Sequence, residues 1–85
     1  MGKSVFNDLV NKKIKAFRGA YPRIHSAHEG YAIIREEVTE LEAEVFKRRR
    51  INDPHKFLNE LVDIAAYCEI FAEDIATWKP GRNHA

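Results

Sequence analysis

The stretch "IREEVTELEAEVF", Ile34 to Phe46, contains five glutamates between positions 36 and 44. Its apolar residues recur every three or four positions, as they do on one face of an α-helix. These residues are Ile34, Val38, Leu41 and Val45. Just upstream, "SAHE" from Ser26 to Glu29 has the pattern of a capping box, in which each side chain bonds the backbone amide of the other. The sequence therefore predicts a long amphipathic helix over about residues 27–49 with an acidic flank.

A shorter helix is predicted before this segment. Ser4 can act as its N-cap and Gly19 suits its end, which gives a helix over about residues 4–19. Its apolar residues follow the same three-and-four spacing and define one buried face. They are Val5, Phe6, Leu9, Val10, Ile14 and Phe17.

A third helix is predicted after the acidic one. Asp53 is placed as its N-cap and Pro54 as its first residue, where the missing amide hydrogen costs nothing, and it extends over about residues 54–77. Because the connection from the second helix is short, we expect the second and third helices to form a long antiparallel hairpin. The predicted apolar face of the third helix consists of Phe57, Leu61, Ile64, Cys68, Phe71 and Ile75.

These segments predict an all-α chain, with a single domain over residues 1–85. A chain of 85 residues is close to the lower size at which one core is adequate. The short first helix is too small to cover the apolar surface of two longer ones. We therefore expect a homodimer or homotetramer in which hairpins complete a four-helix-type bundle.

Composition excludes several classes of protein. The 14 basic and 13 acidic residues give a net charge of +1, without the excess of positive charge expected of a nucleic-acid-binding protein. The single cysteine cannot form an internal disulfide, and no apolar run approaches the roughly 18 residues of a membrane span. Since "MGKSVFNDL" lacks the apolar core of a signal peptide, we expect a cytoplasmic protein with no membrane and no nucleic-acid partner.

The acidic residues of the two long helices are in register. At about 100° per residue, Glu37, Glu40 and Glu44 lie within roughly 60° of one another beside the apolar stripe. Glu60 and Asp63 flank the stripe of the third helix in the same rotational sense, and the hairpin places Glu40 level with Glu60 and Glu37 level with Asp63. Four converging carboxylates would repel one another unless a cation entered. Oxygen ligands without His or Cys favour Mg²⁺ or Mn²⁺.

A solvated face held by salt bridges is the alternative interpretation of these acids. Glu44 has Arg48 four residues later, which supports it. However, Glu36 faces Glu40, and Glu40 faces Glu44, at the same spacing, and each like-charged pair destabilises a helix by about 0.2–0.5 kcal/mol. These repulsive pairs favour the cation site.

The doublet Glu36-Glu37, then Glu40, 19 intervening residues, Glu60 and Asp63 resembles the EExxE…ExxD signature of MazG-like all-α nucleoside triphosphate pyrophosphohydrolases. The resemblance extends from Ser26 to about Asp74 and is to the short bacterial and phage members. It implies Mg²⁺-dependent hydrolysis of an NTP or dNTP to the monophosphate and pyrophosphate. By position, it implies metal ligands at Glu37, Glu40, Glu60 and Asp63, and a catalytic Glu36 that positions or deprotonates the attacking water.

Two further residues on the acidic flank are candidates for substrate binding. Lys56 can contact phosphate or form an ion pair with Glu60. Tyr67 can contact the nucleotide, although aromatic residues at helical spacing more often belong to a core or an interface. The alternative function is a non-catalytic helical interaction or oligomerisation module, which needs only the apolar stripes.

Overall fold

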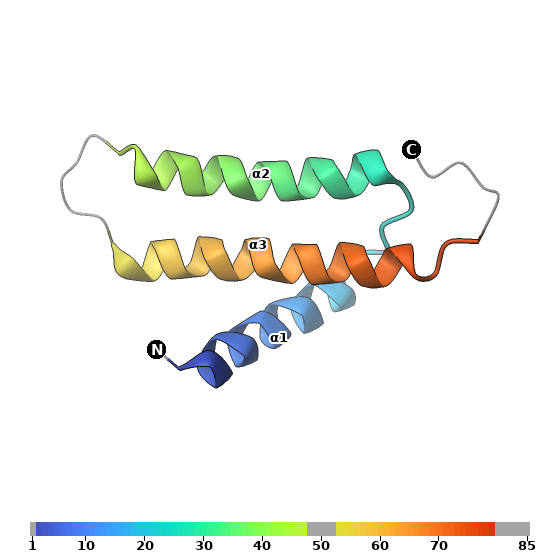
Figure 1. Ribbon diagram of the computed structural model, residues 1–85, viewed down its shortest axis with the longest axis horizontal. Helices are drawn as coiled ribbons and strands as arrows, with labels where there is room; N and C mark the ends of the chain where they lie inside the picture. Colours follow the sequence, from blue (N-terminus) through green and yellow to red (C-terminus); the bar gives the residue numbers. More distant parts are fainter. Residues whose placement is uncertain (1, 48–52, 80–85) are drawn as a thin grey trace.

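The computed structural model describes residues 2–47 and 53–79 of the chain. They form three α-helices, α1 (Lys3–Ala20), α2 (Ala27–Val45) and α3 (Pro54–Ile75), and contain no strand. Figure 1 shows α2 and α3 side by side and antiparallel, with α1 crossing α3 at an angle. Both α1 and α2 pack against α3, which is therefore the central helix. The prediction of an all-α fold with a helical hairpin is confirmed.

The helix starts show how local sequence sets the elements. Ser26 Oγ accepts a hydrogen bond from the Glu29 amide at 3.1 Å, and Asp53 Oδ1 accepts one from the His55 amide at 2.9 Å. These bonds satisfy amides that have no partner within the helix. At α1 the structure differs from the prediction, because Gly2 and not Ser4 occupies the cap position, without a side-chain bond.

The helix ends differ by a few residues from the sequence-based bounds. α2 ends at Val45, before the predicted end at residue 49, and residues 48–52 lie outside the described part of the chain. Its last turn contains acids and no basic residue, which is unfavourable at the negative end of the helix dipole. α3 ends at Ile75, where the amides of Thr77 and Trp78 donate to carbonyls of the preceding turn.

The face of α3 that forms the core is not the one predicted. The buried residues Val62, Ala66 and Ile70 pack against Val10 and Phe17 of α1, together with Ile24 from the connection. The predicted stripe lies on another side of the helix, where Leu61, Cys68 and Ile75 are exposed, although its residue Phe71 packs against the core and against α2. α3 carries apolar residues around most of its circumference, so periodicity alone could not identify the side that α1 covers.

α2 is also rotated relative to the predicted arrangement. Val38 and Val45 of its apolar stripe are exposed, whereas the acidic residue Glu44 is buried. Near its start, Gly30 lies directly against Phe71 of α3: a Cβ atom added there would be 2.5 Å from the ring. α2 therefore turns part of its acidic flank toward α3.

A buried carboxylate fixes the connection between α1 and α2. Asp74 is fully buried, accepts a hydrogen bond from the Ile24 amide at 2.7 Å and forms ion pairs with Arg18 at 2.8 Å and Arg23 at 3.1 Å. Burial raises the pKa of Asp74, but hydrogen bonds from Arg18 and the Ile24 amide, and the charges of both arginines, hold it below its usual value. Trp78 Nε1 donates to the Ile24 carbonyl at 3.0 Å. These polar contacts thus join the C-terminal end of α3 to the C-terminal end of α1 and to the connection that follows it.

Within the described residues, no helix combines the length and apolar character that a membrane crossing requires.

Candidate metal centre

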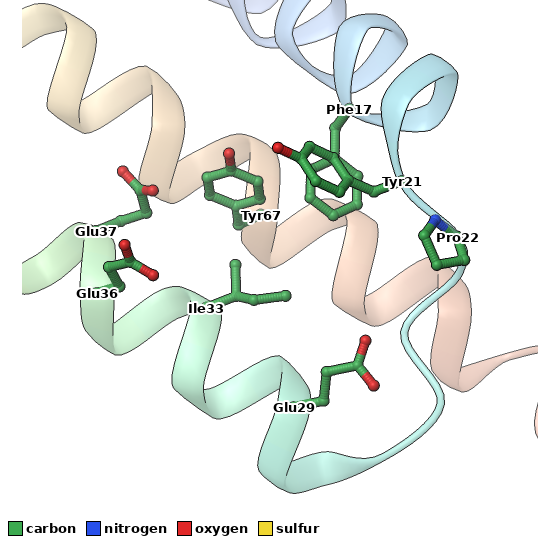
Figure 2. A pocket seen from close by; sticks show the side chains of 8 residues that line it. All are labelled: Phe17, Tyr21, Pro22, Glu29, Ile33, Glu36, Glu37 and Tyr67. Carbon is green, nitrogen blue, oxygen red and sulfur yellow. The ribbon is translucent and has the colours of Figure 1, made fainter.

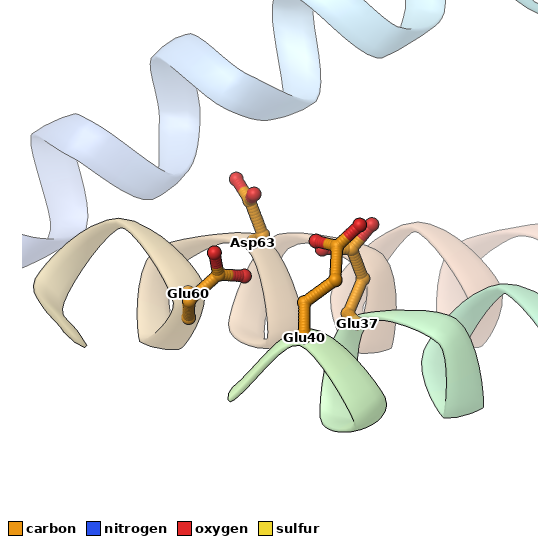
Figure 3. A group of neighbouring side chains, drawn as sticks. All are labelled: Glu37, Glu40, Glu60 and Asp63. Atoms are coloured by element: carbon orange, nitrogen blue, oxygen red, sulfur yellow. The ribbon is translucent and has the colours of Figure 1, made fainter. Parts of the chain in front are cut away.

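Four carboxylates converge between α2 and α3. Glu37 and Glu40 come from consecutive turns of α2, and Glu60 and Asp63 from consecutive turns of α3. Each offers one oxygen, and these four oxygens all lie within 4.8 Å of one another. Figure 3 shows the carboxylates pointing to the side of the hairpin on which α1 lies. The convergence predicted from the spacing is confirmed, while the role of each residue as a ligand stays a prediction.

The cluster contains polar atoms that the protein does not satisfy. Glu40 is exposed, whereas Glu37, Glu60 and Asp63 are partly buried. The Oε2 atoms of Glu37 and Glu60 are buried without a hydrogen-bond partner among the described residues. Buried acceptors of this kind cost free energy unless something donates to them or coordinates them. A cation that reaches both atoms would remove that cost.

The ionisation of the cluster is correspondingly unfavourable. Burial, a hydrogen bond with Glu40, and the charges of Glu40, Asp63 and Glu60 raise the pKa of Glu37 to about 7. Burial, followed by the charges of Glu40 and Asp63, also raises the pKa of Glu60. Near neutral pH, protons therefore compete for oxygens that a metal ion would need.

Lys13 of α1 contributes a positive charge that sequence reasoning missed. Its Nζ lies 3.3 Å from Asp63 Oδ1 and 5.9 Å from the centroid of the Tyr67 ring. Burial lowers the pKa of Lys13, but the charge and hydrogen bond of Asp63 outweigh this effect and raise it. The sequence contains an indication that Lys13 has a specific contact, because this charged residue falls between Leu9 and Phe6 on a helical projection, within the apolar face of the first helix.

The donor set fits a hard divalent cation. All four groups are carboxylates, the ligand type that Mg²⁺ and Mn²⁺ prefer, and no His or Cys belongs to the cluster. The exposed Glu40 leaves one side accessible to solvent. Such a side can admit water and a phosphate-bearing ligand.

A cavity of about 550 Å³ adjoins the cluster (Figure 2). Glu37 belongs to both, so the cluster borders the cavity. One wall is aromatic, with Phe17 centred 5.0 Å from Tyr21 and 5.2 Å from Tyr67. The other wall comes from α2 and includes Glu29 and Ile33.

The remaining predicted site residues lie in different places. Glu36 is exposed and lines the cavity, outside the group of four carboxylates. Tyr67, half-buried, lines the same cavity. Lys56 is exposed in the first turn of α3, does not line this cavity and, among the described residues, forms no ion pair with Glu60. The catalytic role of Glu36 and the substrate-binding roles of the other two stay predictions.

Glu44 lies outside the cluster despite its place on the acidic flank. It is buried and forms an ion pair with Lys47 at 2.8 Å. Arg48, the partner suggested by the sequence, lies outside the described residues. The salt-bridge interpretation of the acidic flank therefore holds for Glu44, and the cation-site interpretation fits the group of four.

Comparison of the chain with protein-family models, with curated proteins and with solved structures finds no match. The features of this chain that point to a function are therefore the spacing of its acids and the geometry of the cluster and its cavity.

Proposed function

We propose that this protein is a Mg²⁺-dependent nucleotide pyrophosphohydrolase, for which Mn²⁺ can substitute, that cleaves an NTP or dNTP to the monophosphate and pyrophosphate. The observation that carries the proposal is the four-carboxylate cluster, in which two buried oxygens have no hydrogen-bond partner among the described residues, beside a cavity of about 550 Å³. A cluster alone supports metal binding, and the adjoining cavity supports an organic ligand.

The four carboxylates and Glu36 have different roles in the proposed hydrolysis. Glu37, Glu40, Glu60 and Asp63 would hold the ion, which when bound supplies charge neutralisation at phosphate oxygens and a more acidic water. Glu36 lies next to Glu37 in the chain, on the cavity side, where its carboxylate can accept the proton of a water that attacks the α-phosphorus.

Lys13 is a second source of positive charge for the phosphates. Its ammonium group lies 3.3 Å from Oδ1 of Asp63, and its side chain is partly exposed. When the carboxylate binds a metal ion, the ammonium group can turn toward a phosphate oxygen. This accounts for a lysine on the apolar face of α1.

Cleavage between the α- and β-phosphates agrees with the sequence. The chain has no Gly-rich phosphate loop of the kind that cradles the γ-phosphate in phosphoryl-transfer enzymes. Placement by metal and charge is then the main contribution of the protein to the reaction.

The proposal is tested by incubating the purified chain with Mg²⁺ and a panel of NTPs and dNTPs, and by resolving the phosphorus-containing products by ³¹P NMR. We expect the monophosphate and pyrophosphate. Glu60→Gln and Asp63→Asn should each abolish turnover with the helices intact by circular dichroism, since loss of a charge lowers the repulsion in the cluster. Glu42→Gln, an equal change of charge at an exposed position of α2, is the control and should remain active.

Release of orthophosphate with the diphosphate, or full activity of both variants, contradicts the proposed reaction. The exposed apolar residues of the hairpin favour the second candidate, a non-catalytic interaction module. That module would tolerate loss of all four carboxylates and would show no metal-dependent change in stability.

A further inference from the structure

The cavity beside the cluster has the position required of a base-binding site, if the phosphates bind at the carboxylates. Glu37 lines both spaces, and Glu29 lies at the far end of the cavity on the same helix. These two residues are eight positions apart, which is about 12 Å along α2. A nucleoside with its first phosphate can extend over such a length.

The charge of the lining determines which part of a nucleotide can enter. Among the described residues, the charged side chains that line the cavity are all acidic: Glu29, Glu36 and Glu37. A polyphosphate is repelled by these groups and can approach only where a cation offsets them, at the cluster. An uncharged base is not repelled in this way.

The aromatic wall offers a surface for stacking. The Tyr21 ring is packed at 5.0 Å against Phe17, yet the residue remains 62% exposed. Tyr67 meets Phe17 edge to face at 5.2 Å and is thereby held in place. Every nucleobase has a π-face, so such rings bind bases without distinguishing strongly among them.

Selectivity must then come from the polar edge of the cavity. The backbone amide of Glu29 is used by the Ser26 cap, but its carboxylate does not form the reciprocal bond of a capping box with the Ser26 amide. In Figure 2 this carboxylate instead points into the space between α2 and the Tyr21–Pro22 segment. When it is ionised, a carboxylate accepts hydrogen bonds and donates none.

We propose that the cavity receives the nucleobase and that Glu29 makes it prefer cytosine and adenine, which carry an amino group at C4 or C6, over uracil and thymine, which carry a carbonyl at C4. Exocyclic amino groups donate to a carboxylate. The C4 carbonyl of uracil or thymine in the same place would set two acceptors against each other, and the cost of leaving them unpaired discriminates between the bases. This inference deepens the proposed hydrolase function and rests on it for the placement of the phosphates.

The test compares CMP with UMP, which differ at this edge by an amino group in place of a carbonyl. Binding in the presence of Mg²⁺ is followed by two-dimensional ¹H–¹⁵N NMR titration, which requires no turnover. We expect CMP to bind about tenfold more tightly than UMP. In Glu29→Gln the side-chain amide can also donate, so the ratio should fall to about one or reverse. Glu42→Gln should keep the wild-type ratio, and Tyr21→Leu should weaken both ligands by similar factors.

Equal affinities for CMP and UMP, failure of both to bind, or an unchanged ratio in Glu29→Gln each overturn the inference. Hydrolysis of triphosphates together with equal affinities would leave the hydrolase function standing without this selectivity. A Glu29-dependent preference for CMP in a protein that hydrolyses no triphosphate would support the base site and reject the hydrolase function.

Discussion

At the scale of single residues, Glu37 links the two halves of the candidate site, because its carboxylate belongs to the cluster and also lines the cavity. Burial and the neighbouring acids raise its pKa from 4.5 to about 7. A pKa that is higher in the folded than in the unfolded protein contributes stability below the unfolded value. That contribution is lost as the pH rises through the folded value.

We therefore expect the melting temperature, measured in EDTA, to fall as the pH rises from about 5 to about 8. Saturating Mg²⁺ should reduce this fall, because the ion stabilises the ionised cluster and binds better as protons leave. Glu37→Gln, which cannot titrate, should show a shallower fall in EDTA than the wild type. Thermal melts at four pH values, with and without Mg²⁺, provide the measurement. Identical slopes in EDTA and Mg²⁺ would show that the cluster binds no metal ion.

At the scale of helices, the close approach of α2 to α3 depends on a glycine within a helix. An added Cβ at Gly30 would be 2.5 Å from the Phe71 ring, whereas one at Gly19 of α1 would meet nothing within 4 Å. Gly30→Ala should destabilise the fold by about 1–3 kcal/mol through forced repacking, less the ~1 kcal/mol that Ala gains over Gly in a helix.

Gly19→Ala is the matched control and should be neutral or stabilising by up to ~1 kcal/mol. Urea denaturation gives the free energy of unfolding of each variant, and Gly30→Ala should be the less stable of the two. Equal midpoints and slopes for the two variants would mean that the Phe71 ring moves aside without cost.

The helices and the acidic cluster could be predicted from sequence because both depend on local rules. Caps mark the helix starts, and a short hairpin connection sets which turns of α2 and α3 lie level. The buried faces could not be predicted, since periodicity shows where apolar residues lie but not which side a neighbour covers. Asp74 lies more than 50 residues from Arg18, and no local pattern joins an acid to a base at such a distance. The ion pair between Lys13 and Asp63 could not be predicted for the same reason, because it joins α1 to α3.

At the scale of the whole molecule, the hairpin has an acidic side and an apolar side. On helical projections, Val38 and Val45 lie about 140–160° from Glu40 on α2, and Leu61 lies about 160° from Asp63 on α3. Antiparallel helices preserve rotational sense, so these apolar residues share the side of the hairpin opposite the cluster. They are 43%, 48% and 47% exposed, respectively, and α1 packs elsewhere on α3.

We predict that a second copy of the chain covers this apolar side. Two hairpins, each with a pair of antiparallel helices, match each other across a two-fold axis and complete a four-helix bundle, while both acidic clusters stay open on the outer sides. Leu61→Glu should therefore convert a dimer or tetramer to monomers in sedimentation velocity at micromolar concentration. Val5→Glu places the same charge on a residue of α1 that is 48% exposed and should leave the assembly intact. A wild-type chain that sediments as a stable monomer at micromolar concentration would contradict the predicted assembly.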